Sequence, residues 1–141
     1  MKKTIVTLLA IFWAVWAIGQ GVTPPAAALS HISMTFNDPE EVRWDHEGGR
    51  YEAMWKENGR WMGSVYAEDG THLTSSREIL ESELPEAMLS KMNASYPGAP
   101  FLDGRKRENA DGSIRYQVEV KVGTDAKMLI LDLPAPVKSE D

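Results

Sequence analysis

Two stretches of the sequence resemble each other at a constant offset of 60 residues. The first, residues 25–36, reads PAAALSHISMTF, and the second, residues 85–96, reads PEAMLSKMNASY. In both, a proline is followed by apolar residues at positions i+4 and i+7 and by an aromatic residue at i+11. Such a proline suits the first turn of a helix, and the apolar spacing is typical of a buried helix face. The repeat therefore predicts two equivalent helices, and its meaning is structural.

Each expected helix is followed by short segments in which apolar and polar residues alternate, as in half-buried strands. A second echo, RYE at residues 50–52 and RYQ at residues 115–117, lies within these segments. Asn58-Gly59 predicts a tight hairpin, because both residues tolerate positive φ. Residues 71–80 form a less regular connector with room for a short strand. The expected strands are residues 41–47, 50–56 and 60–66 in the first half and residues 101–108, 113–122 and 126–133 in the second.

These patterns predict an α+β domain made of two tandem helix-plus-three-strand repeats. The two halves are expected at about residues 24–70 and 84–133. Because each half is too small to bury a core of its own, we expect them to pair into one domain over residues 20–133. The strands should form an antiparallel sheet with both helices packed on one face. Residues 134–141 are polar and contain proline, which predicts a flexible tail.

The N-terminus has the features of a secretory signal peptide. Lys2 and Lys3 precede an apolar run over residues 5–18, and small residues at positions 17 and 19 suit cleavage after Gly19. The alternative is an uncleaved membrane anchor, but the run is short for a segment that must span a bilayer with about 20 residues. We therefore expect residues 1–19 to be removed and the exported chain to begin at Gln20.

The composition restricts the class of partner. The whole chain has 15 basic and 21 acidic residues, and without residues 1–19, which hold two lysines and no acid, its net charge changes from −6 to −8. Such a charge argues against nucleic acid and anionic membrane surfaces as partners. The chain has no cysteine, which excludes disulfides and lipoprotein acylation. We expect a protein of the periplasm or the medium, without a stable membrane anchor and stabilised by its hydrophobic core.

Several short motifs follow one another in a recognisable order. The first half contains VRW at residues 42–44, GRYEA at 49–53, NG at 58–59 and EDG at 68–70, and the second contains LP at 84–85, YP at 96–97, DG at 111–112 and YQVEV at 116–120. Together they resemble the PepSY-like family of exported bacterial proteins, related in fold to the β-lactamase inhibitory protein, over residues 25–133. The resemblance implies a binding or inhibitory role with contacts on the open side of the sheet. It implies no defined set of functional residues.

The sequence has no recognisable catalytic or metal-binding motif. His31, His46 and His72 are isolated, lack the spacing of metal ligands and are expected to face solvent. The acidic turns at residues 68–70 and 111–112 lack the ligand spacing of an EF-hand loop and are better interpreted as hairpin turns. We therefore expect no catalytic residues, no bound metal and no cofactor.

The aromatic residues of the first half are the candidates for binding. Trp44, Tyr51 and Trp55 share the strand parity assigned to the helix side, which predicts core packing. Trp61 and Tyr66 lie on opposite parities of one strand, so at least one should face away from the helices. Trp61 and Tyr66 are therefore the predicted binding residues, since aromatic side chains give large contact areas at low entropy cost. A stabilising cross-strand pair is the alternative.

The favoured hypothesis is a non-catalytic exported protein-binding module, such as an inhibitor or regulator of a periplasmic or cell-surface enzyme. One alternative is a sensor domain that holds a small ligand or a cation on its acidic surface. A less favoured alternative is a hydrolase that uses carboxylates such as Glu52 and Glu119, which occupy similar places in the two halves. The sequence does not indicate an oligomeric state.

Overall fold

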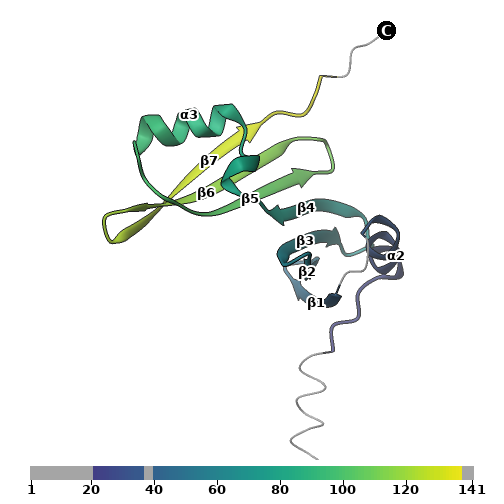
Figure 1. The fold of residues 1–141 in the computed structure, drawn as a ribbon. Coiled ribbons are helices and arrows are strands. Elements are labelled where there is room, and N and C mark those ends of the chain that lie inside the picture. The colour runs from purple at the N-terminus through teal and green to yellow at the C-terminus, as the bar shows by residue number, and fades with distance from the viewer. Residues whose placement is uncertain (1–20, 37–39, 138–141) are drawn as a thin grey trace, which may run out of the picture.

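The computed structural model describes residues 21–36 and 40–137. The predicted signal peptide, the expected helix stop at residues 37–39 and the last four residues of the predicted tail lie outside this part. The described elements, in chain order, are α2 (Ala26–Thr35), β1 (Glu40–Glu47), β2 (Arg50–Glu57), β3 (Arg60–Ala67), β4 (His72–Glu78), the 3-10 helix η1 (Glu81–Glu83), α3 (Glu86–Ser95), β5 (Phe101–Asn109), β6 (Ile114–Val122) and β7 (Asp125–Leu133) (Figure 1).

The strands of the described residues form one antiparallel sheet in the order β1-β2-β3-β4-β5-β6-β7, so each strand pairs with its neighbours in the sequence. Such a meander needs tight turns, and turn residues of positive φ supply them. Asn58 and Gly59, with φ of 51° and 77°, connect β2 to β3 as predicted. Gly48 and Gly49, with φ of 59° and 73°, connect β1 to β2.

The prediction of two tandem helix-plus-three-strand repeats is wrong. Residues 72–78, in the predicted connector, form the full strand β4, which pairs with β3 on one side and β5 on the other. The first helix is thus followed by four strands and the second by three, all in a single sheet. The sequence of β4, HLTSSRE, has no apolar alternation. The α+β class stands, but a central strand between the halves replaces the strict repeat.

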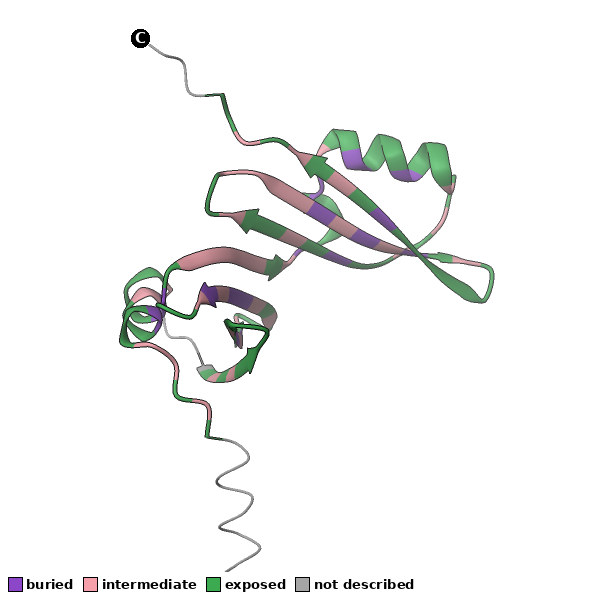
Figure 2. Ribbon diagram, turned by 180° about the vertical axis from the view of Figure 1, so that it is seen from behind, coloured by how far each residue is buried: buried purple, intermediate pink, exposed green. Residues whose placement is uncertain are grey.

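Both helices lie on the same face of the sheet. Along one row of paired residues, Ser64 of β3 faces Ser75 of β4, which faces Glu108 of β5, and Glu108 faces Ile114 of β6. Ser64 lies on the strand face that α2 covers, and Ile114 packs against the core under α3. We call this side the helix face, and Figure 2 shows its buried residues on α3 and β6.

Each helix covers a core of its own. Beneath α2 the buried residues are Ala28, Ile32, Ala53, Trp55 and Tyr66. Beneath α3 they are Ile79, Leu84, Met88, Met92, Tyr116, Val118, Val120 and Leu129. Trp55 is buried in the α2 core, and Trp44 and Tyr51 are partly buried against it, which confirms the predicted orientation of all three.

Fewer side chains of each helix are buried against the sheet than the sequence predicts. Leu29 and Leu89 were expected on the buried faces, but they are 48% and 42% exposed. The buried positions are Ala28 and Ile32 on α2 and Met88 and Met92 on α3, which are spaced by four residues in each helix. Each helix therefore packs on the sheet through a single row of side chains at positions i and i+4.

Candidate functional site

The face of the sheet opposite the helices is uncovered among the described residues, and we call it the open face. It consists of the residues that alternate with those of the helix face, and the register places the following on it: Arg43, Asp45 and Glu47 on β1; Arg50, Glu52, Met54 and Lys56 on β2; Trp61, Gly63 and Val65 on β3; Thr74, Ser76 and Glu78 on β4; Arg105 and Arg107 on β5; and Arg115, Gln117 and Glu119 on β6.

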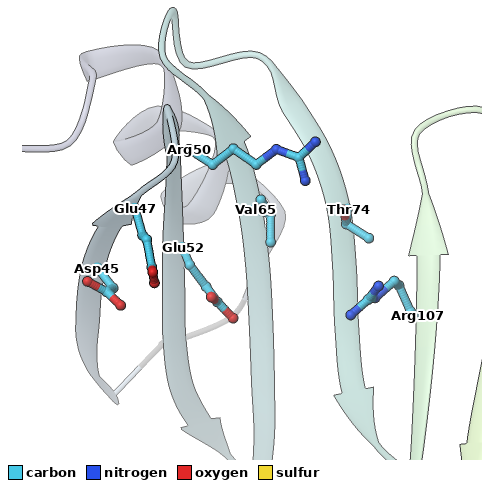
Figure 3. A pocket seen from close by; sticks show the side chains of 7 residues that line it. All are labelled: Asp45, Glu47, Arg50, Glu52, Val65, Thr74 and Arg107. Carbon is cyan, nitrogen blue, oxygen red and sulfur yellow. The ribbon is translucent and has the colours of Figure 1, made fainter.

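The open face contains a hollow of about 320 Å³, which we call the central hollow. Side chains from five strands line it, namely Asp45, Glu47, Arg50, Glu52, Val65, Thr74 and Arg107. Figure 3 shows the carboxylates on the side of β1 and β2 and the guanidinium group of Arg107 entering from β5. Val65 and Thr74 lie between these charged groups, and the side chain of Arg50 extends above Val65. The hollow is thus acidic on one side and basic on the other.

Among the described residues, no salt bridge joins the charged side chains that line the hollow, although Glu47 and Arg50 face each other across β1 and β2. Within the described part of the chain, the salt bridges are His46–Glu68, Arg60–Glu83 and Arg115–Asp132, and none includes a residue of the central hollow. Asp45 accepts a hydrogen bond of 2.9 Å from the backbone N–H of His46, which is its neighbour in the chain. Three carboxylates and two guanidinium groups therefore remain open to charged groups from outside.

The register also places like charges directly opposite each other on the open face. Asp45 of β1 faces Glu52 of β2, and Arg107 of β5 faces Arg115 of β6. Directly opposed like charges destabilise an antiparallel pair. Arg115 donates to both carboxylate oxygens of Asp132 at 2.7 and 3.0 Å, and this hydrogen bonding lowers the pKa of Asp132. Arg115 is thereby compensated, whereas the opposition of Asp45 and Glu52 is not.

Trp61, the first predicted binding residue, lies on the open face and is 37% exposed. The ammonium group of Lys56 lies 4.9 Å from the centre of its ring, a cation–π distance. Its backbone N–H donates to Oε2 of Glu78 at 3.1 Å. Trp61 lines a second hollow, of about 560 Å³, together with Glu41, Arg43, Trp55 and Lys56. It is therefore a partly exposed aromatic group on the same face of the sheet as the central hollow.

Tyr66, the second predicted binding residue, lies on the helix face and is 0% exposed. Its hydroxyl group is 2.7 Å from Nδ1 of His31 on α2, and burial raises the pKa of its phenol. The expectation that at least one of Trp61 and Tyr66 faces away from the helices is met by Trp61. Tyr66 packs in the core beneath α2 and offers no surface to a partner, so the structure does not bring the two residues together.

The carboxylates named for a hydrolase are also separated. Glu52 lies on β2 opposite Asp45 and Val65, and Glu119 lies on β6 opposite Asp103 and Met128. Three strands separate β2 from β6, and only Glu52 lines the central hollow. In residues 21–36 and 40–137 there is no cluster of three or more histidine or acidic residues that could hold a metal ion.

The sequence pattern missed most of the central hollow. Asp45, Glu47 and Glu52 alternate with the predicted core residues of β1 and β2, so their parity could have placed them together on the open face. The place of Arg107 beside these carboxylates could not be inferred from strand parity. It reaches the hollow only because β4 lies between β3 and β5 and sets their spacing.

Comparisons with solved structures identify the fold. A BLIP-like protein from Bacteroides fragilis NCTC 9343 is 17% identical, with a TM-score of 0.63 over 89% of this chain and 96% of its own. The chain has a BLIP-like fold. A DUF2874 family protein from Bacteroides ovatus ATCC 8483 is 16% identical, with a TM-score of 0.65 over 78% of this chain and 81% of its own. A protein from Bacteroides eggerthii DSM 20697, provisionally assigned to the periplasm, is 12% identical, with a TM-score of 0.68 over 77% of this chain and 81% of its own.

These proteins share the fold of this chain, but their sequence identities to it are too low to establish a shared function. No protein-family model and no curated protein matches the sequence, so the PepSY-like resemblance stays a prediction. Neither α2 nor α3 nor η1 is long and apolar enough to cross a membrane.

The opposition of Asp45 and Glu52 predicts a gain in stability when one charge is removed. Glu52→Gln should raise the free energy of unfolding by about 0.2–1 kcal/mol at low salt, because it keeps the shape and removes the repulsion. Added salt should reduce this gain by screening. Glu57→Gln is the matched control, since Glu57 faces Arg60 across the strands and should show no gain. Urea denaturation measures both, and an equal loss of stability in the two variants would contradict the electrostatic account.

Proposed function

We propose that this chain is an exported, non-catalytic protein-binding module that inhibits or regulates a periplasmic or cell-surface enzyme through the open face of its sheet. The observation that carries this proposal is the central hollow, where five charged side chains from β1, β2 and β5 are not neutralised within the described chain. Charges held without compensation cost stability, which is consistent with selection for binding at the site.

The proposed partner is a protein surface with segregated charges. Basic side chains of the partner would meet Asp45, Glu47 and Glu52, and an acidic side chain would meet Arg107. The floor between these groups suits close approach, because the open-face residues of β3 and β4 there include Gly63, Val65, Thr74 and Ser76. At Gly63 a Cβ atom would lie only 2.6 Å from Oγ of Ser76. The two strands are therefore close here, and no side chain projects from the sheet at Gly63.

Trp61 is proposed as an anchor beside the charged hollow. Tryptophans frequently dominate binding energy, and the ammonium group of Lys56 packs over the ring of this one, while Glu78 holds its backbone N–H. A side chain fixed before binding loses little entropy on association. The proposed contact surface thus combines a large aromatic group with complementary charge.

Two further parts of the proposal concern relationship and location. The motif order over residues 25–133 supports a PepSY-like relationship, and the BLIP-like fold is compatible with it. The basic and apolar N-terminus supports export, and the fold similarity to a protein provisionally assigned to the periplasm is in agreement.

The binding proposal is tested by comparing charge variants of the full chain as baits. Wild type, Arg107→Glu and Glu52→Lys are immobilised and exposed to periplasmic and cell-surface extracts of the producing bacterium. Lys127→Glu is the control for Arg107→Glu, because it makes the same charge change at an exposed residue on the helix face. A true partner should be retained by wild type and by Lys127→Glu and be lost from the two hollow variants.

The partner found in this way is then purified and titrated against each variant. We expect Arg107→Glu and Glu52→Lys each to raise Kd by about tenfold or more, which corresponds to about 1.4 kcal/mol. Binding should also weaken with added salt. If every retained protein binds Arg107→Glu as well as wild type, the open face is not the contact surface.

The export proposal predicts the mass of the purified protein. Cleavage after Gly19 should leave a chain that begins at Gln20, often blocked because N-terminal glutamine cyclises. Intact-mass spectrometry of the extracellular and periplasmic fractions measures the loss of residues 1–19. Full-length protein in the membrane fraction would instead show a retained anchor, and full-length protein in the cytosol would refute export.

A further inference from the structure

Two histidines form a stacked pair on the helix face, on the opposite side of the sheet from the central hollow. The ring of His31 on α2 and the ring of His72 on β4 have centres 4.4 Å apart and planes inclined by 20°. Nδ1 of His31 lies 2.7 Å from the hydroxyl oxygen of Tyr66, and Nε2 of His72 lies 2.8 Å from Oγ of Ser75. Both rings are partly buried, so the expectation that these histidines face solvent is wrong.

This pair lies where α2 meets the sheet. Apart from Ala28 and Ile32, the described residues of α2 are not fully buried, so the helix packs on the sheet through only a small apolar contact. His31 adds a side-chain hydrogen bond to Tyr66, and its ring also packs edge-on against Tyr66 and Phe36. The docking of α2 therefore depends in part on the state of one imidazole ring.

The groups around the pair are mainly uncharged. Its own helix, AAALSHISMT, has no other titratable side chain, and β3 presents the phenol of Tyr66. From β1 and β2 the helix face presents Trp44, Tyr51 and His46, and the ring of His46 pairs with Glu68. On β4 the helix face continues from Ser75 to Arg77, and β5 places Glu108 opposite Ser75 and Lys106 opposite Arg77. In the part of the chain that the structure describes, no carboxylate forms a hydrogen bond or salt bridge with either ring.

Protonation of the rings would oppose this arrangement in two ways. The imidazolium ion carries a hydrogen on both ring nitrogens, so protonated His31 could only donate to the hydroxyl oxygen of Tyr66, and the phenol hydrogen would lose Nδ1 as its acceptor. Two imidazolium rings stacked at 4.4 Å would also repel each other without a counter-charge. In agreement, burial and, second, the charge of His72 lower the pKa of His31 below its ordinary value of 6.5.

We propose that His31 and His72 form a proton-sensitive latch, which holds α2 on the sheet while both rings are neutral and releases it when the pH falls. The latch rests on the stacked geometry and is independent of the proposed partner. A metal ion is not the better explanation for the pair, because the lone pairs of a ring lie in its plane and two nearly parallel stacked rings do not converge on one ion.

The direction of the pH effect follows from the difference between the folded and unfolded states. Because the folded state lowers the pKa of His31, the unfolded helix segment binds more protons between the two pKa values. The stabilising effect is therefore fully present above the unfolded value of about 6.5, and it is lost as the pH falls below that value towards the folded one.

Hydrogen exchange on the full chain tests the latch. Amide protection factors, corrected for intrinsic exchange rates, are measured at pH 7.5 and pH 5.0 for residues of α2 and for residues of α3. The helix α3 has no histidine and serves as the internal control. We expect α2 to lose protection at pH 5.0 while α3 keeps it, and equal behaviour of the two helices would overturn the latch.

Two variants separate the pair from other acid effects. His31→Gln keeps an acceptor for Tyr66 without a titratable ring, and His72→Gln removes the neighbouring charge, so both should reduce the loss of α2 protection at pH 5.0. His46→Gln is the control, since the ring of His46 bonds to Glu68 and stacks on Tyr51, not on a residue of α2, and the variant should leave the loss unchanged. An undiminished loss in both latch variants contradicts the proposal. If these variants do not fold, an NMR titration of wild type decides, and a His31 midpoint at or above 6.5 overturns the latch.

Discussion

The pairing of β4 with both β3 and β5 is the interaction on which the rest of the structure depends. The two cores, one beneath α2 and one beneath α3, are separate clusters of buried residues. Between them the helix face of β4 and β5 carries polar residues such as Ser75, Arg77, Lys106 and Glu108. The backbone hydrogen bonds of β4 therefore join the halves where little apolar contact does, and a half of this size with its small core would be only marginally stable alone.

This central strand also creates the candidate site. The acidic side of the hollow comes from β1 and β2, and Arg107 comes from β5, so the site exists only when β4 holds the halves in one sheet. The two layers have different roles in this account. The helix face supplies the buried cores, while the open face displays charges that the described chain leaves uncompensated. A stiff sheet backed by helices keeps these charges in fixed positions, which favours binding by complementarity over adaptation.

Much of the local structure could be predicted from the sequence, because it depends on local signals. The prolines and apolar spacing identified both helices, Asn58-Gly59 identified a hairpin, and strand alternation placed Trp44, Tyr51 and Trp55 in the core. The strand β4 could not be identified in this way, because its helix face lies between the two cores and is mostly polar, and its other face belongs to the open face. Its sequence thus lacks the apolar period that marks a half-buried strand.

The same distinction between local and long-range signals applies to the functional residues. Strand parity predicted that at least one of Trp61 and Tyr66 faces away from the helices, but parity alone did not decide which of the two does. Arg107 and the pair of His31 with His72 could not be predicted, because each brings together segments that are distant in the sequence. His31 and His72 meet only because α2 packs across the sheet as far as β4. Contacts of this kind depend on register and layer order, which a single sequence does not reveal.

The central claim is that β4 makes the two halves one cooperative unit. Pulse-labelling hydrogen exchange with mass spectrometry, performed across a urea series, follows β2 (Arg50–Glu57) and β6 (Ile114–Val122) separately in the same sample. The account predicts that peptides from both strands lose protection at the same urea concentration. Two transitions at distinct urea concentrations, with one half still protected while the other exchanges, would contradict it.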